Sequence, residues 1–355
     1  DAAKVIIANP YGITVNGASF INASDVVLAT GAVAGITGNI VNFQLGNNAL
    51  TVQDPTTSGA TSLSAQGLAL ISRQIGIAGK IEADKLRVVA HNGQAILDTT
   101  NTIGTITTNT TGALGSAAPT LAIDSSALGG MYANTISLIA TEAGAGVKVL
   151  GNMAALGDAI TIQANGDLVV GSGSTPTSLN ANTITLESTN ASNDVTLSNA
   201  VLTAAKTNVS VTSGNTTTVT NTGGTVSVTA AGDLVLDKTT VRAEAGTGTV
   251  NGNVTLTAAT VTDSATTGRE SVVTAGGRLR VAAGATTVAA SDLVGKTVDI
   301  DAASLTLGAT ALIGSSNTTA TATDVVNITT TGDANIAGEL STGSGSSSVT
   351  AANVT

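Results

Sequence analysis

Residues 7–31 read IANPYGITVNGASFINASDVVLATG, in which short apolar runs alternate with tight corners. The segment Asn9-Pro10-Tyr11-Gly12 predicts a turn, because proline fixes its own φ and glycine accepts a positive φ. The β-branched residues on both sides of this turn favour extended chain. A succession of strand, corner and strand is typical of a chain that coils around a narrow core.

Segments in which apolar and polar residues alternate recur along the chain, about 24 residues apart on average. They begin at Ile136, Ile160, Ile184, Val209, Val226, Val254, Val272, Val298 and Ile328. The alternation has the two-residue period of a strand, which excludes helical repeats. We therefore expect an all-β protein, a right-handed parallel β-helix (a solenoid) in the form of an elongated rod.

The repeats also predict which residues are buried and where the chain turns. Inward-facing columns are expected at Ile136, Leu138, Ile160, Ile162, Ile184 and Leu186. The glycines of four similar corners, residues 165–167, 231–233, 276–278 and 331–333, are expected to supply a positive φ. Residues 341–348, STGSGSSS, are expected to form a flexible loop or the start of a linker.

Composition agrees with a thin core. Aromatic residues make up 1% of the chain, whereas apolar residues make up 42%, which is too many for a disordered chain. The net charge of −10 argues against a nucleic-acid partner, which would require a basic surface. Cysteine is absent and no apolar run is long enough for a transmembrane helix, so neither a disulfide framework nor a membrane span is expected.

Few residues suggest catalysis or ligand binding. His91 is the only histidine and precedes Asn92-Gly93, so we expect a solvated turn residue rather than a member of a catalytic group. Asp299 and Asp301 flank the inward Ile300 and should both point outward, as paired carboxylates do in β-helical polysaccharide-processing enzymes. Arg278 and Arg280 are the closest basic pair, but no arginine- or aspartate-rich segment is predicted at the matching phase one coil away, so a solvated edge is the preferred interpretation.

Other patterns remain incomplete. Gly295-Lys296-Thr297 lacks the first glycine of a phosphate-binding loop and leads into a strand. Pairs such as Thr255/Thr257 and Thr260/Thr262 do not recur at one fixed period, so a flat threonine array for binding ice or another surface is the less favoured alternative. We expect no catalytic residue, no cofactor and no metal ligand in this chain.

The quoted stretch resembles the NPNGI segment of the secretion domain in the filamentous-haemagglutinin family, the large exoproteins of two-partner secretion. Gly17, the Phe20-Ile21-Asn22 triplet and the Thr30-Gly31 pair stand in register with the rest of that pattern, whereas Tyr11 replaces the family's usual second asparagine. Two further segments resemble later parts of the family pattern, in the same order. They are LISRQIGIAGKIEADKLRVVA (residues 70–90) and LGGMYANTISLIATEAGAGVKV (residues 128–149).

The resemblance implies a domain division and a function. Residues 1–120 would be the C-terminal part of a two-partner secretion domain, with Asn9, Pro10, Tyr11, Gly12 and Ile13 as its secretion motif. Upstream residues would cap the first coil. Residues 121–355 would form a stalk of haemagglutinin-type repeats.

The implied protein is secreted to the cell surface of a Gram-negative bacterium through an outer-membrane β-barrel transporter. Its function would be that of an adhesin that binds receptors or glycans on host or neighbouring cells. The alternative is the stalk of a contact-dependent toxin.

Overall fold

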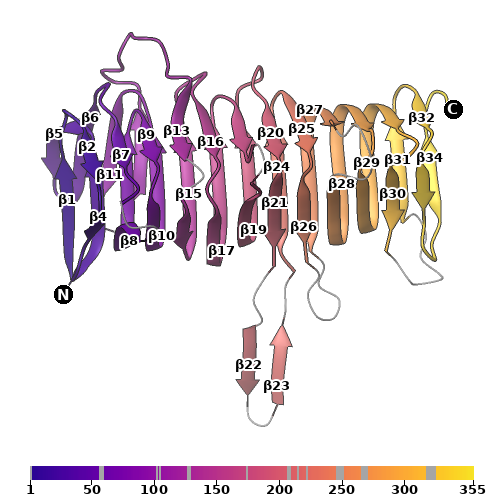
Figure 1. Ribbon diagram of the computed structural model, residues 1–355, viewed down its shortest axis with the longest axis horizontal. Helices are drawn as coiled ribbons and strands as arrows, with labels where there is room; N and C mark the ends of the chain where they lie inside the picture. Colours follow the sequence, from indigo (N-terminus) through magenta and orange to yellow (C-terminus); the bar gives the residue numbers. More distant parts are fainter. Residues whose placement is uncertain are drawn as a thin grey trace. The chain divides into compact units, whose positions relative to one another are not determined.

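The computed structural model describes residues 2–55, 60–100, 103, 105–125, 129–172, 175–205, 209–213, 216–220, 223–244, 252–264, 271–316 and 325–355. The chain divides into two compact units, Asp1–Val169 and Val170–Thr355, and each is described by itself. Throughout the described residues the regular elements are β-strands (Figure 1). Among those residues no helix could cross a membrane.

Parallel ladders form three faces of the first unit. The first face contains β1 (Ala3–Ala8), β4 (Ala23–Ala29), β8 (Thr61–Ser72), β10 (Lys80–Ala90), β15 (Thr135–Ala140) and β17 (Met153–Ala164). The second contains β2 (Ile13–Val15), β7 (Leu50–Val52), β9 (Ile75–Ile77), β13 (Leu121–Ser125) and β16 (Gly146–Val149). The third pairs β3 (Ala18–Ser19) and β14 (Met131–Ala133) with the first halves of β8, β10 and β17. Parallel pairing of strands from successive turns of the chain is the architecture of a parallel β-helix.

Inward side chains of the first face stack in columns. One column runs through Val26, Leu68, Leu86, Ile136 and Ile160, which occupy matching positions on β4, β8, β10, β15 and β17. All five are at most 2% exposed. Each such burial contributes about 1.5–3 kcal/mol, so the columns are the main source of stability in a core with few aromatic residues.

A second hydrophobic layer covers the outside of this face. The strands β5 (Gly31–Thr37), β6 (Ile40–Leu45), β11 (Gln94–Asp98) and β12 (Thr105–Asn109) form an antiparallel sheet in the order β12-β11-β6-β5. Its Phe43 and Leu97 pack in one cluster with Val27 of β4 and with Ala69 and Ile71 of β8. Both faces of β4 and β8 are therefore buried, a feature that the alternating repeats did not predict.

The second unit repeats the same architecture. Its main ladder joins β19 (Thr177–Ser188), β24 (Thr225–Ala230), β27 (Asn253–Asp263), β28 (Val272–Val288), β29 (Asp292–Leu307), β31 (Val326–Thr330) and β34 (Ser347–Thr350). Ile184, Val226, Val254, Leu279 and Val298 align in one fully buried column. The six inward residues predicted from the sequence, two of them in this unit, are all fully buried, so the predicted phase is confirmed.

Two of the predicted repeat starts are wrong. Val209 begins β22 (Val209–Ser213), which pairs antiparallel with β23 (Thr216–Thr220) in a separate two-stranded sheet (Figure 1). The column of buried residues instead continues from Ile184 of β19 directly to Val226 of β24. Val272 pairs with Thr240 of β26 (Thr240–Ala243), and Leu279 occupies the column position. Inserted segments therefore change the spacing between coils, which a search for a regular period cannot detect.

Two local predictions also need correction. Residues 341–348 are not the start of a linker, because Ser341 ends β33 (Glu339–Ser341) and Ser347 begins β34, which pairs with β31. The loop that the sequence offered as the other possibility is limited to residues 342–346, between these two strands. None of the predicted corner glycines has a positive φ, and Gly276 and Gly277 lie within β28 rather than at a corner. A Cβ atom on Gly166, Gly232 or Gly332 would lie 2.5–2.9 Å from an atom of a neighbouring coil. Close contact between coils, not backbone handedness, requires glycine at these corners.

Candidate functional site

The corner at residues 9–13 joins β1 to β2 and is stabilised by its own side chain. Asn9 Oδ1 accepts a hydrogen bond from the Tyr11 amide at 3.1 Å, and Asn9 Nδ2 donates to the Gly12 carbonyl at 2.9 Å. The Gly12 amide closes the turn on the Asn9 carbonyl at 3.2 Å. The Asn9 side chain therefore supplies hydrogen-bond partners that backbone groups of the turn would otherwise lack.

The next coil supports the same corner. Asn48 Nδ2 donates to the Pro10 carbonyl at 2.8 Å, and the Ile13 amide donates to the Ala49 carbonyl at 3.2 Å. Gly12 has φ +104°, and a Cβ atom there would lie 3.2 Å from the Ala49 oxygen. The conformation predicted for Gly12 from the sequence is confirmed, and a side chain at this position would be strained.

Two apolar side chains close to the corner in sequence contribute little to the core. Tyr11 is 87% exposed and Ile21 is 86% exposed. They are the two most exposed of the large hydrophobic side chains found exposed in the described residues. Their surfaces are accessible for contact with another molecule.

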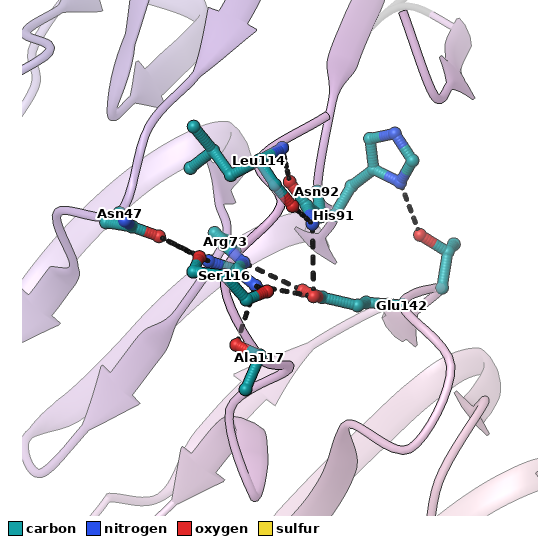
Figure 2. Close-up of polar contacts among 9 residues, drawn as sticks. Asn47, Arg73, His91, Asn92, Leu114, Ser116, Ala117 and Glu142 are labelled. Atoms are coloured by element: carbon teal, nitrogen blue, oxygen red, sulfur yellow. Dashed lines mark hydrogen bonds and ion pairs between the residues drawn. The ribbon is translucent and has the colours of Figure 1, made fainter. Parts of the chain in front are cut away.

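A buried polar cluster lies elsewhere in the first unit, directly after β8 (Figure 2). Arg73, whose side chain is 4% exposed, donates to both carboxylate oxygens of Glu142, from Nε at 2.9 Å and from Nη2 at 2.6 Å. Its other donors reach Asn47 Oδ1, Ser116 Oγ and the carbonyls of Ser116 and Ala117. These contacts engage all three nitrogens of the guanidinium. The hydrogen bonds with Glu142 raise the pKa of Arg73 above its usual value, against the lowering effect of burial.

Asn92 extends the cluster to a loop. Its Nδ2 donates to the Leu114 carbonyl at 3.0 Å and to Glu142 Oε1 at 3.1 Å, while its Oδ1 accepts from the Leu114 amide at 2.8 Å. Arg73, Asn92 and Glu142 were not among the residues predicted to be functional. One signal could have found two of them, because Arg73 and Glu142 lie in the two later segments that resemble the family pattern.

His91 is not the solvated turn residue predicted from the sequence. It is 6% exposed, and both ring nitrogens have partners. Nε2 lies 2.7 Å from the Asn109 carbonyl and Nδ1 lies 2.6 Å from Thr141 Oγ1. Because a carbonyl can only accept, Nε2 carries the proton in the neutral ring and Nδ1 accepts from the threonine hydroxyl. His91 thus joins the end of β12 to the corner after β15.

The paired carboxylates of the second unit point outward on either side of buried Ile300, as predicted. Each forms an ion pair with the preceding coil, Asp299 with Arg278 at 2.5 Å and Asp301 with Arg280 at 3.2 Å. The prediction that no charged partners lie at the matching position one coil away is therefore wrong, because β28 places both arginines beside the carboxylates of β29. Lys296 and Thr297 lie within β29, so the incomplete phosphate-loop pattern is part of a strand. Among the described residues, no three histidine or acidic side chains are grouped as metal ligands would be.

The geometry of the first unit defines a class: a parallel β-helix with an external antiparallel sheet and an asparagine-stabilised corner between its first strands. Residues 1–170 match the family model of the TPS secretion domain. This match covers just under half of the chain, so residues 1–170 are similar to the secretion domain of two-partner exoproteins.

Similar proteins match over the same region. The 16S rRNA endonuclease CdiA of Enterobacter cloacae is 37% identical over 170 residues, and the filamentous hemagglutinin of Bordetella pertussis is 30% identical over 173 residues. Each match covers 48% of this chain and 5% of the relative. The crystal structure of the filamentous hemagglutinin secretion domain covers 66% of this chain and 67% of its own, with 24% sequence identity and a TM-score of 0.41.

Proposed function

We propose that this chain is carried across the outer membrane by a β-barrel transporter of the two-partner pathway. The match of residues 1–170 to the TPS secretion domain is the observation that carries the proposal. In this proposal residues 1–120 belong to the secretion domain and residues 121–355 form a stalk of repeats, the division predicted from the sequence. The boundary remains a prediction, since neither the extent of the family match nor the division into compact units tests it.

We further propose that Asn9, Pro10, Tyr11, Gly12 and Ile13 act in export. Asn9 and Gly12 supply the hydrogen bonds and the backbone conformation of the corner. Tyr11 supplies an exposed aromatic ring that the fold does not use. The corner would therefore act both as an early folded element and as a surface that the transporter contacts.

Secretion assays in the full-length protein with its transporter test this role. Gly12→Val strains the corner, and Tyr11→Ala removes the exposed ring without removing a buried contact. Both variants are expected to reduce the amount of exoprotein in the medium. The control is Ser264→Val, at an exposed position of the second unit. Equal secretion of all three variants would show that the corner has no special role in export.

The exported body is proposed to be a β-helical stalk of an adhesin, with receptors or glycans of host or neighbouring cells as partners. The resemblance to filamentous hemagglutinin supports this choice. A cell-binding assay with the purified full-length exoprotein tests it, and absence of binding would argue for another role.

The alternative is the stalk of a contact-dependent toxin, and a specific observation favours it. Several relatives carry names of toxins or nucleases, although only 5% of each corresponds to this chain. Growth inhibition of neighbouring bacteria by the full-length protein would support the alternative.

The 355 residues themselves are proposed to be non-enzymatic and to bind no cofactor. Turnover of a polysaccharide that is lost in Asp299→Asn would overturn that proposal.

A further inference from the structure

An exposed loop of the first unit is held by buried side chains. Residues 110–117, here called the tether loop, follow β12 and are mostly exposed. Asn92 binds both the amide and the carbonyl of Leu114, and Arg73 Nη2 donates to the Ala117 carbonyl at 2.9 Å. A separate contact, from Gln44 Nε2 to the Gly112 carbonyl at 2.9 Å, does not involve these two side chains.

Both loop-holding side chains depend on one carboxylate (Figure 2). Glu142 Oε1 accepts from Arg73 Nη2 at 2.6 Å and from Asn92 Nδ2 at 3.1 Å. Glu142 is the only acidic residue among the hydrogen-bond partners found for Arg73. A buried guanidinium that loses its only anion is strongly unfavourable. The closed arrangement of the loop is therefore coupled to the position of Glu142.

Glu142 is also the last member of the cluster along the chain. It lies 69 residues after Arg73 and 50 residues after Asn92. Its place is set by β15, which pairs with β10 up to Ala140 and Ala90, and by the Thr141 amide, which donates to the Ala90 carbonyl. A chain folded only as far as β12 has the loop-holding side chains Arg73 and Asn92 in place but not the carboxylate that fixes them.

We propose that Glu142 is a latch that closes the tether loop only after the coil containing β15 has docked on β10. Until then Arg73 remains a cation without its carboxylate, and the earlier coils with their loop can still open. Completion of the first unit thus requires the chain to extend beyond residue 142. The latch would matter during export, and only that consequence depends on the proposed function.

Pulsed hydrogen exchange during refolding of the purified 355-residue chain tests the order of events. Peptides from β8 and β10 should become protected first, and the Leu114 amide should become protected together with β15. Protection of the tether loop before β15 would overturn the proposal. This experiment requires no variant and no transporter, so its failure would leave the export proposal intact.

A variant tests the coupling in the folded state. Glu142→Gln keeps the size of the side chain and removes its charge. Exchange of the Leu114 amide should become roughly 10- to 100-fold faster, the range expected for loss of a hydrogen bond to a charged group. Exchange in the centre of β8 should not change. The matched control is Glu82→Gln, which removes a carboxylate from the exposed ion pair with Lys80 in the same unit. Wild-type exchange of Leu114 in Glu142→Gln would overturn the latch.

Discussion

At the scale of single residues, glycine has two different uses in this chain. Gly12 is required because its φ is +104° and a side chain would also approach the Ala49 carbonyl. Gly166 has no positive φ, but a Cβ atom would lie 2.5 Å from the Ala145 carbonyl carbon of the adjacent coil. A coiled chain thus needs glycine both where the backbone turns left-handed and where two coils touch.

Alanine substitutions separate these effects in the corner. Gly12→Ala should reduce the free energy of unfolding by about 1–3 kcal/mol, because both the backbone and the contact with Ala49 are strained. Gly17 is the control, since its φ is +75° and a Cβ atom there would have no neighbouring atom within 4 Å. Gly17→Ala should cost less, and denaturant unfolding of the two variants measures the difference. An equal loss would mean that the Ala49 contact contributes nothing.

At the scale of strands, the inward columns are the elements on which stability depends. Ile184→Asp would place an unpaired charge beside Val226 in a fully buried environment, at a cost of about 3–5 kcal/mol. Thr185→Asp is the matched control, because Thr185 faces outward on the same strand. Thermal unfolding should show a large decrease in melting temperature for the first variant alone. Retention of the melting temperature in Ile184→Asp would show that the inward phase is assigned wrongly.

The β22–β23 hairpin is an insertion rather than a coil. The strands on either side of it, β21 (Ala200–Ala204) and β24, pair with β19, β26 and β27 and not with the hairpin. Replacing residues 206–222 with a short Gly-Ser linker should therefore leave the melting temperature of the second unit nearly unchanged. Loss of cooperative unfolding would show that the hairpin is needed to align the coils.

At the scale of the whole molecule, most strands have one row of side chains in the core and one row in contact with water. Inward positions are aliphatic, and the outward positions that alternate with them are mostly threonine, serine and asparagine, which explains a chain with only 10% charged residues. Far-ultraviolet circular dichroism should show β-structure with almost no helical signal. A substantial helical signal would contradict both the period-two alternation and the observed ladders.

The amino-acid sequence alone determined the β-helical class, the inward phase of the strands and the conformation of the Gly12 corner. These properties are local, because alternation within a strand and the φ of one residue depend on neighbouring residues. The family resemblance followed from three short segments in their order. The outward direction of Asp299 and Asp301 was predicted for the same local reason.

Only the tertiary structure decided which coils are adjacent across insertions, and therefore which polar residues meet. Arg73 and Glu142 are 69 residues apart, and their contact depends on the pairing of β15 with β10. Burial of His91 depends on Asn109 and Thr141, which separate strands bring to it. The external sheet around Phe43 likewise depends on long-range pairing of β6 with β11. Such contacts are not encoded in a repeat length, because insertions change the spacing without changing the register.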